Sequence, residues 1–273
     1  MIWMLAVAVL LAMLVVMVAA WAFCLAVRNG GWTDVFWTFG SGVTMAMAAL
    51  IPLSPGATPA PQQWLVCGMV LLWMIRLGLY LAPRVATLPE DARYARFRAE
   101  WGRTFPLKML WVTLPQAPAT ALLSLSVLAA ARRPEPTLDR RDWVGVAILI
   151  VALAGEALAD SQMRRFRTDP ARRGKVMSDG LWAWSRHPNY FFQWLGWLAY
   201  PAMVFDPARP ISWVSFAGPL VMYALLRHVS GVPPLEDAML RSRGEAFRSY
   251  QARVSVFFPW PPKASPSRVS PTP

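Results

Sequence analysis

The sequence predicts an all-α, polytopic membrane protein that crosses the bilayer about seven times. Of its 273 residues, 56% are hydrophobic and only 15% are charged, and the mean hydropathy is +0.37. This balance is too apolar for a soluble domain of ordinary charge density. The apolar residues also fall into runs of roughly 20, the number that a helix needs to cross a hydrocarbon core. Helices are expected because no lipid-exposed backbone amide can remain unpaired.

Seven apolar runs approach or exceed this length and are expected to be the transmembrane helices. They are residues 2–27, 35–53, 63–82, 107–130, 143–159, 190–205 and 211–227. The first lacks a basic start and is too long for the apolar part of a signal peptide, so a retained helix is expected. Pro115 and Pro118 predict a kink in the fourth. Residues 1–260 are expected to form one integral membrane domain, followed by a disordered Pro/Ser-rich tail over residues 261–273.

Alternate loops differ in their content of basic residues. Of the 27 Lys and Arg residues, 21 fall on one side of the predicted helices and five on the other. The positive-inside rule therefore predicts an N-terminus outside and a cytosolic C-terminus, in a multi-pass protein of the cell inner membrane. An anionic inner leaflet explains the net charge of +12, and nucleic-acid binding is not expected.

Two of the basic loops are expected to hold short helices. Residues 89–101 and residues 233–250 each begin with proline and acidic residues, which favour a helix N-terminus. Aromatic and aliphatic residues follow at helical spacing, so each helix is expected to lie against the membrane or against the helix ends.

Two carboxylates lie close to the end of the fifth apolar run. Glu156 and Asp160 are four residues apart and share a helix face, where they repel each other unless a cation or a hydrogen-bonding ligand lies between them. Arg164 or Arg167 would supply such a cation. Alternatively, the pair faces a cavity that opens to the cytosol and binds a cofactor, with Arg167 on a phosphate group. The spacing leaves both interpretations open.

The densest group of polar residues directly precedes the sixth apolar run. Arg186, His187, Asn189 and Tyr190 surround Pro188. A helix start explains Pro188 and a capping Asn189, but a cap requires only one such residue. This many polar groups at a membrane surface favours an anionic ligand held beside an apolar one.

The run Trp184–Tyr190 resembles the motif before a late helix in the steroid 5-alpha-reductase-like family of membrane reductases. Residues 90–94, 231–236 and 250–260 are similar to the bacterial branch of that family, and the resemblance covers residues 29–260. It implies an NADPH-dependent oxidoreductase acting on CH–CH bonds, like a 3-oxo-5-alpha-steroid 4-dehydrogenase. Hydride would pass from a cofactor in a cytosol-open cavity to an activated carbon–carbon double bond of a lipophilic substrate, either steroid-like or another enone.

The polar motif and the resemblance together suggest the site residues. Cofactor contacts are expected at Glu156, Asp160, Arg167, Arg186, His187, Asn189, Tyr190, Arg243 and Tyr250. Gln193 stands where eukaryotic members carry an acid, and Tyr80 is the candidate for the tyrosine that polarises the substrate carbonyl. These two are the expected catalytic residues. Glu156 departs from the family, which often has asparagine at that position, and no metal is expected.

The main alternative is a membrane methyltransferase that uses S-adenosylmethionine. Isoprenylcysteine and phospholipid methyltransferases are similar over the same late-helix motif and the C-terminal segment. A sulfonium donor carries no phosphates, so Arg167, Arg186 and Arg243 favour NADPH. A non-catalytic scaffold or channel would leave Asn189 and Tyr250 without a function. Since no Gly-x-Gly-x-x-Gly motif follows a strand, helix ends and loops would have to hold a nucleotide.

Overall fold

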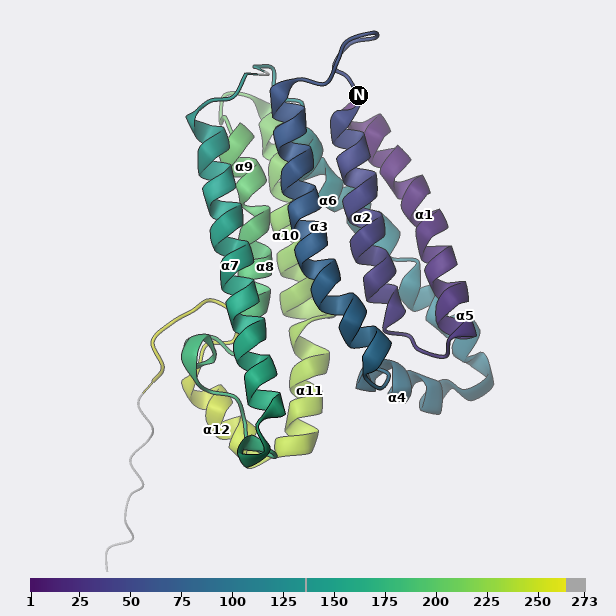
Figure 1. Ribbon diagram of the computed structural model, residues 1–273, viewed down its shortest axis with the longest axis vertical. Helices are drawn as coiled ribbons and strands as arrows, with labels where there is room; N and C mark the ends of the chain where they lie inside the picture. Colours follow the sequence, from purple (N-terminus) through teal and green to yellow (C-terminus); the bar gives the residue numbers. More distant parts are fainter. Residues whose placement is uncertain (136, 264–273) are drawn as a thin grey trace, which may run out of the picture. The chain divides into compact units, whose positions relative to one another are not determined.

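A computed structural model describes residues 1–135 and 137–263 (Figure 1). Its regular elements are helices, with one isolated backbone bridge, which confirms the predicted all-α class for this part of the chain. The structure has two compact units: unit 1 is residues 1–149 and 197–222, and unit 2 is residues 150–196 and 223–273. Most of the predicted tail, residues 264–273, lies outside the described residues.

Unit 1 is built mainly from the N-terminal helices, of which α1, α2 and α3 pack side by side (Figure 1). Its main helices are α1 (Ile2–Ala26), α2 (Trp32–Leu50), α3 (Pro61–Thr87), α4 (Ala92–Trp101), α5 (Phe105–Thr113), α6 (Gln116–Ala131), the first part of α7 (Arg140–Thr168), α9 (Ala199–Val204), the 3-10 helix η4 (Pro210–Phe216) and most of α10 (Ala217–Ala224). Asp91 caps α4 by accepting a hydrogen bond from the Arg93 amide at 3.0 Å, so the first predicted loop helix is confirmed.

Helix α1 has two apolar faces, one buried in the protein and one exposed on its surface. Leu5, Val9, Met13 and Met17 recur every fourth residue and are buried in a core shared with α2 and α6. The other side of α1 is equally apolar but exposed: Met4, Val7, Leu11, Val15 and Val18. A continuous exposed apolar face of this kind is unfavourable in water and favourable in lipid.

Glycines let α2 and α3 approach each other closely. A Cβ atom added at Gly42 would lie 2.4 Å from the side chain of Met74, and one added at Gly78 would lie 2.4 Å from the ring of Phe39. Small residues at such crossings bring helix backbones together, which is the usual source of helix association within lipid.

Four helical stretches in the described residues are long and apolar enough, by length and composition, to cross a membrane. They are Ile2–Ala26, Pro61–Thr87, Arg93–Ala131 and Arg140–Thr168. Several apolar helices of this length are typical of a membrane protein. The third includes the predicted interruption, since α5 ends at Thr113 and α6 begins at Gln116, directly after Pro115.

The last two predicted spans are not continuous α-helices. The sixth is divided into α8 (Pro188–Trp197) and α9, because Pro201 has no amide hydrogen for the carbonyl of Trp197. The seventh is divided into η4, α10 (Ala217–Ala224) and a π-helical turn, η5 (Leu225–Val229).

A serine from α6 compensates for the proline in the seventh predicted span. Pro219 cannot donate to the carbonyl of Ser215, four residues earlier. The Ser126 hydroxyl donates to that carbonyl instead, at 2.5 Å, and accepts a hydrogen bond from the Gly218 amide at 2.7 Å. The irregular backbone is therefore paired within unit 1, as a low-dielectric surrounding requires.

Unit 2 contains the second part of α7, α8, α11 (Val232–Arg243) and α12 (Glu245–Arg253). Helix α7 continues to Thr168, nine residues beyond the predicted span, as a polar extension. The second predicted loop helix is two helices, because Gly244 adopts φ +50° between α11 and α12. Left-handed backbone of this kind ends a helix and favours glycine.

A fully buried ion pair, which sequence analysis missed, joins several helix ends in unit 1. The Arg133 guanidinium donates to the Asp142 carboxylate at 3.1 Å and to the carbonyl of Met203 at 3.0 Å. The Gln62 amide and the Asp139 backbone amide also donate to this carboxylate, at 3.1 and 2.7 Å. The ends of α6 and α9 and the starts of α3 and α7 therefore share one charged centre.

Asp142→Ala is expected to lower the free energy of unfolding by about 3–5 kcal/mol, because it removes the buried partner of Arg133 and leaves only the more exposed Asp139 carboxylate, at 3.4 Å. Unfolding of the detergent-solubilised protein by increasing sodium dodecyl sulfate measures this. Arg141→Ala, which removes the exposed pair with Asp139, is the control and should change stability by at most about 1 kcal/mol. Equal effects of the two substitutions would contradict the assigned role of Asp142.

Candidate functional site

Four of the predicted site residues gather where α7 packs against α8 in unit 2. The Asn189 amide lies 3.5 Å from the Asp160 carboxylate. A Cβ atom at Gly155 would lie 2.4 Å from the ring of Phe192, so the two helices are in close contact one turn further along. Since α7 runs towards this end and α8 away from it, Glu156 lies at the level of Gln193.

This group, which we call the α7–α8 polar face, consists of Glu156, Asp160, Asn189 and Gln193. The two carboxylates and Gln193 are buried, and Asn189 is half-buried. Charged and amide groups are costly within apolar helices and usually mark a binding or reaction site there. The polar face is therefore the candidate centre of the site.

Arg186, expected on a cofactor phosphate, is bound to the protein itself. Its guanidinium donates to the Glu236 carboxylate at 2.7 Å and to the carbonyls of Gln251 and Val254 at 3.0 and 2.8 Å. Backbone contacts reinforce this arrangement, because the Arg186 amide donates to the Ser255 carbonyl at 2.8 Å. In this structure Arg186 fixes the C-terminal segment to the turn before α8.

His187 shares the Glu236 carboxylate with Arg186. Its Nε2 atom lies 3.0 Å from Glu236 Oε1, and its ring stacks on Tyr190 at a centroid distance of 5.5 Å. Burial lowers the pKa of the imidazole, and the hydrogen bond to Glu236 only partly opposes this. Burial would raise the pKa of Glu236, but the hydrogen bonds from His187 and Arg186 outweigh it and hold that pKa at about 2.

These pKa directions fix the tautomer of His187. Near neutral pH the Glu236 carboxylate is ionised and only accepts hydrogen bonds, so His187 Nε2 must carry the proton. The lone pair is then on Nδ1, which is buried and has no hydrogen-bond partner among the described residues. A ligand donor is one group that would satisfy it.

Tyr250, also expected to contact the cofactor, forms a hydrogen bond within the protein. Its hydroxyl donates to the carbonyl of Trp182 at 2.5 Å, and the Trp182 indole donates to the carbonyl of Ala159 on α7 at 3.1 Å. Burial raises the pKa of Tyr250, so the phenol stays protonated at neutral pH. Tyr250 therefore ties α12 to the turn before α8.

The other predicted residues lie further from the polar face or in the other unit. Arg167 is exposed near the end of α7, seven residues after Asp160 and therefore on the same side of that helix. Arg243 is half-buried and donates to the carbonyl of Lys175 at 3.3 Å. Tyr80 belongs to unit 1, where the Arg76 guanidinium lies 5.7 Å from its ring centre.

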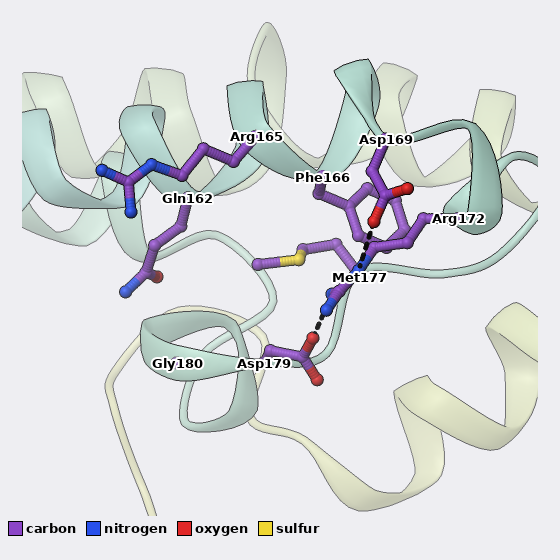
Figure 2. Close-up of a pocket in the computed structure, with 8 residues that line it drawn as sticks. All are labelled: Gln162, Arg165, Phe166, Asp169, Arg172, Met177, Asp179 and Gly180. Carbon is purple, nitrogen blue, oxygen red and sulfur yellow. Dashed lines mark hydrogen bonds and ion pairs between the residues drawn. The ribbon is translucent and has the colours of Figure 1, made fainter.

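A cavity of about 290 Å³ lies beside the α7 extension (Figure 2). Its lining residues are Gln162, Arg165, Phe166, Asp169, Arg172, Met177, Asp179 and Gly180. Gln162, Arg165 and Phe166 lie on one face of α7. Figure 2 shows Asp169 and Asp179 both directed towards Arg172. The carboxylates of Asp169 and Asp179 therefore already neutralise the charge of Arg172.

Sequence analysis missed Glu236 and Gln251 as members of this network. Gln251 donates to Glu236 at 2.7 Å, so the carboxylate receives bonds from three side chains. The run Gly231–Glu236 indicates a helix start and is part of the family resemblance, but neither observation gives Glu236 a role. Nothing in local spacing indicates that Glu236 pairs with a residue 50 positions earlier.

The stability of unit 2 is expected to fall on acidification. A lowered His187 pKa means that the unfolded chain takes up the proton first as pH falls through 6.5, which favours unfolding. The contribution of Glu236 is complete above pH 4.5 and is lost as pH falls from there towards 2. Glu236→Gln should therefore cost about 2 kcal/mol at pH 7 and flatten the pH dependence below 4.5.

Denaturation curves between pH 3 and pH 7.5 measure both effects. Glu245→Gln is the matched control, because Glu245 is exposed on α12 and pairs only with exposed Arg248 among the described residues. An unchanged slope below pH 4.5 in the Glu236→Gln variant would show that this carboxylate is not the titrating group.

Comparison with known proteins places the chain in a family. It is similar to "Uncharacterized protein C594.04c" of Schizosaccharomyces pombe, with 26% identity over 194 residues that cover 62% of this chain and 55% of the yeast protein. No solved structure matches the chain. A family model described as "Protein of unknown function (DUF1295)" matches residues 20–254, including the whole α7–α8 polar face, and the chain belongs to that family.

Proposed function

We propose that the protein is an NADPH-dependent membrane reductase that transfers hydride to an activated carbon–carbon double bond of a lipophilic enone, steroid-like or otherwise. The observation that carries this proposal is the buried α7–α8 polar face within apolar helices. Amide and carboxylate groups in such a place suit the ribose and carboxamide groups of a nicotinamide nucleotide, and the apolar helices suit the substrate.

The residues of the polar face can be given roles in such a reaction. NADPH, when bound, would supply the hydride, and a proton from water would complete the reduction at the neighbouring carbon. Asp160 and Asn189 would orient the nucleotide by hydrogen bonds. The Gln193 amide, one turn further along α8, would donate to the substrate carbonyl and stabilise the charge that develops on its oxygen. His187 Nδ1 would accept a hydrogen bond from a cofactor hydroxyl or amide, which would satisfy its buried lone pair.

The cofactor phosphates would be bound by arginines that lie beyond the apolar part of the helices. Arg167 lies on the same side of α7 as Asp160, beyond the apolar part of the helix, and its guanidinium can pair with phosphate in two-point geometry. Arg186 already donates to Glu236 and two carbonyls, so its proposed role is to position the turn that holds Asn189. This leaves fewer arginines for a polyphosphate, and an S-adenosylmethionine-dependent methyltransferase remains the second candidate.

The proposal includes a membrane topology. Seven passes, with the N-terminus outside and the C-terminus in the cytosol of an inner membrane, would place the arginine-rich ends of α7 and α11 on the side where NADPH is available. Membrane lipids and the lipophilic substrate would be the partners. A reporter fused to the C-terminus should therefore be cytosolic.

Asn189→Ala is expected to weaken NADPH binding to the detergent-purified protein by about tenfold or more, because it removes a half-buried hydrogen-bonding amide of the polar face. Fluorescence titration with NADPH, alongside calorimetric titration with S-adenosylmethionine, measures this. Arg241→Ala on the exposed side of α11 is the control for folding and charge. Saturable binding of S-adenosylmethionine alone would overturn the reductase proposal.

Arg243→Ala should weaken NADPH binding by about tenfold and NADH binding much less, if its guanidinium meets the 2′-phosphate. Arg241→Ala, two residues earlier on the same helix, should leave the ratio of the two dissociation constants unchanged. An equal loss for NADPH and NADH would remove Arg243 from the phosphate site.

A further inference from the structure

We propose a second binding site, for a phosphate group, at the C-terminal end of α1 in unit 1. A cavity of about 450 Å³ is lined there by Arg28, Arg98 and Arg103 together with Leu25, Phe105 and Pro106. Three guanidinium groups beside an apolar wall would match a phosphate that carries an apolar or neutral substituent. All lining residues belong to unit 1, and none is a member of the α7–α8 polar face.

The charge around this cavity is not neutralised from within. Arg98 pairs with Glu90 at 2.9 Å and lies over the Phe105 ring at 4.3 Å. Arg28 and Arg103 are exposed, and among the described residues neither has a hydrogen bond or ion pair from its side chain. Two unneutralised arginines facing one cavity attract an anion, and phosphate is the anion whose geometry guanidinium groups match.

The backbone holds Arg28 at the cavity in an unfavourable conformation. Its φ of +54° is the only positive value of a non-glycine residue in the described part of the chain. Neighbouring contacts fix the turn, because Asn29 donates from its side chain to the Val85 carbonyl at 3.2 Å and the Gly30 amide donates to Glu90 at 2.7 Å. Left-handed backbone is unfavourable for a bulky residue, and glycine or asparagine adopts it more readily.

The surroundings of the cavity are those of a membrane interface. The Trp21 indole donates to the carbonyl of Pro106 at 2.8 Å, and Lys108 lies 5.7 Å from the Trp101 ring centre. Further along α5, Leu107 and Trp111 are 63% and 71% exposed. Tryptophan and lysine beside an exposed apolar surface are typical of the headgroup level, where phosphates of anionic lipids are concentrated.

The test uses the full-length protein in an uncharged maltoside detergent. Native mass spectrometry with equal amounts of phosphatidylglycerol and phosphatidylcholine measures the lipid arm, and titration with glycerol 3-phosphate and inorganic phosphate measures the soluble arm. The test variant is Arg28→Asn with Arg103→Gln, because asparagine tolerates the left-handed backbone of residue 28. The control is Arg140→Gln with Arg241→Gln, which removes two exposed arginines elsewhere.

One phosphatidylglycerol retained per protein, with affinity reduced about tenfold or more in the test variant and unchanged in the control, would support a lipid headgroup site. Binding of glycerol 3-phosphate or inorganic phosphate with the same loss would support the site with a soluble occupant. Equal affinity in the test variant and the wild type, or equal losses in test and control variants, would overturn the proposal. Thermal unfolding without added ligand confirms that both variants fold.

Discussion

The guanidinium of Arg186 connects three parts of unit 2 that are far apart in the sequence. It lies in the turn before α8, and its donors reach Glu236 on α11 and the carbonyls of Gln251 and Val254 near the end of α12. Such charge-assisted hydrogen bonds contribute roughly 1.5–3 kcal/mol each when they replace solvent contacts well. The position of Asn189, three residues later, therefore depends on a C-terminal segment about 60 residues away.

This arrangement explains why so many polar residues occur in one short run. Ser185 donates to the carbonyl of Phe257 at 2.8 Å, and Arg186 binds Glu236. The Nδ1 atom of His187 has no hydrogen-bond partner among the described residues. Ser185 and Arg186 hold the turn. His187 and Asn189 are the candidates for contact with a ligand. One motif thus combines structural residues with candidate ligand contacts, and composition alone does not separate them.

The sequence predicted the helices well where hydrocarbon alone determines them. Helix α1 differs from its predicted range by a single residue, and the break at Pro115 lies where expected. It predicted them less well where tertiary contacts supply missing hydrogen bonds. The π-helical turn of η5 and the Ser126 contact to the carbonyl of Ser215 depend on partners that no local pattern reveals. That Glu156 lies at the level of Gln193, by contrast, follows from helical spacing once α7 and α8 are known to be adjacent.

The position of the turn before α8 depends most directly on the energetic coupling between Arg186 and Glu236. A double-mutant cycle with Arg186→Met and Glu236→Met, read by the free energy of unfolding and by NADPH binding, measures it. We expect a coupling energy of at least about 1 kcal/mol in stability, with each single variant weakening NADPH binding nearly as much as the double variant. Additive effects within about 0.5 kcal/mol would contradict the assignment of Arg186 as the residue that holds the site together.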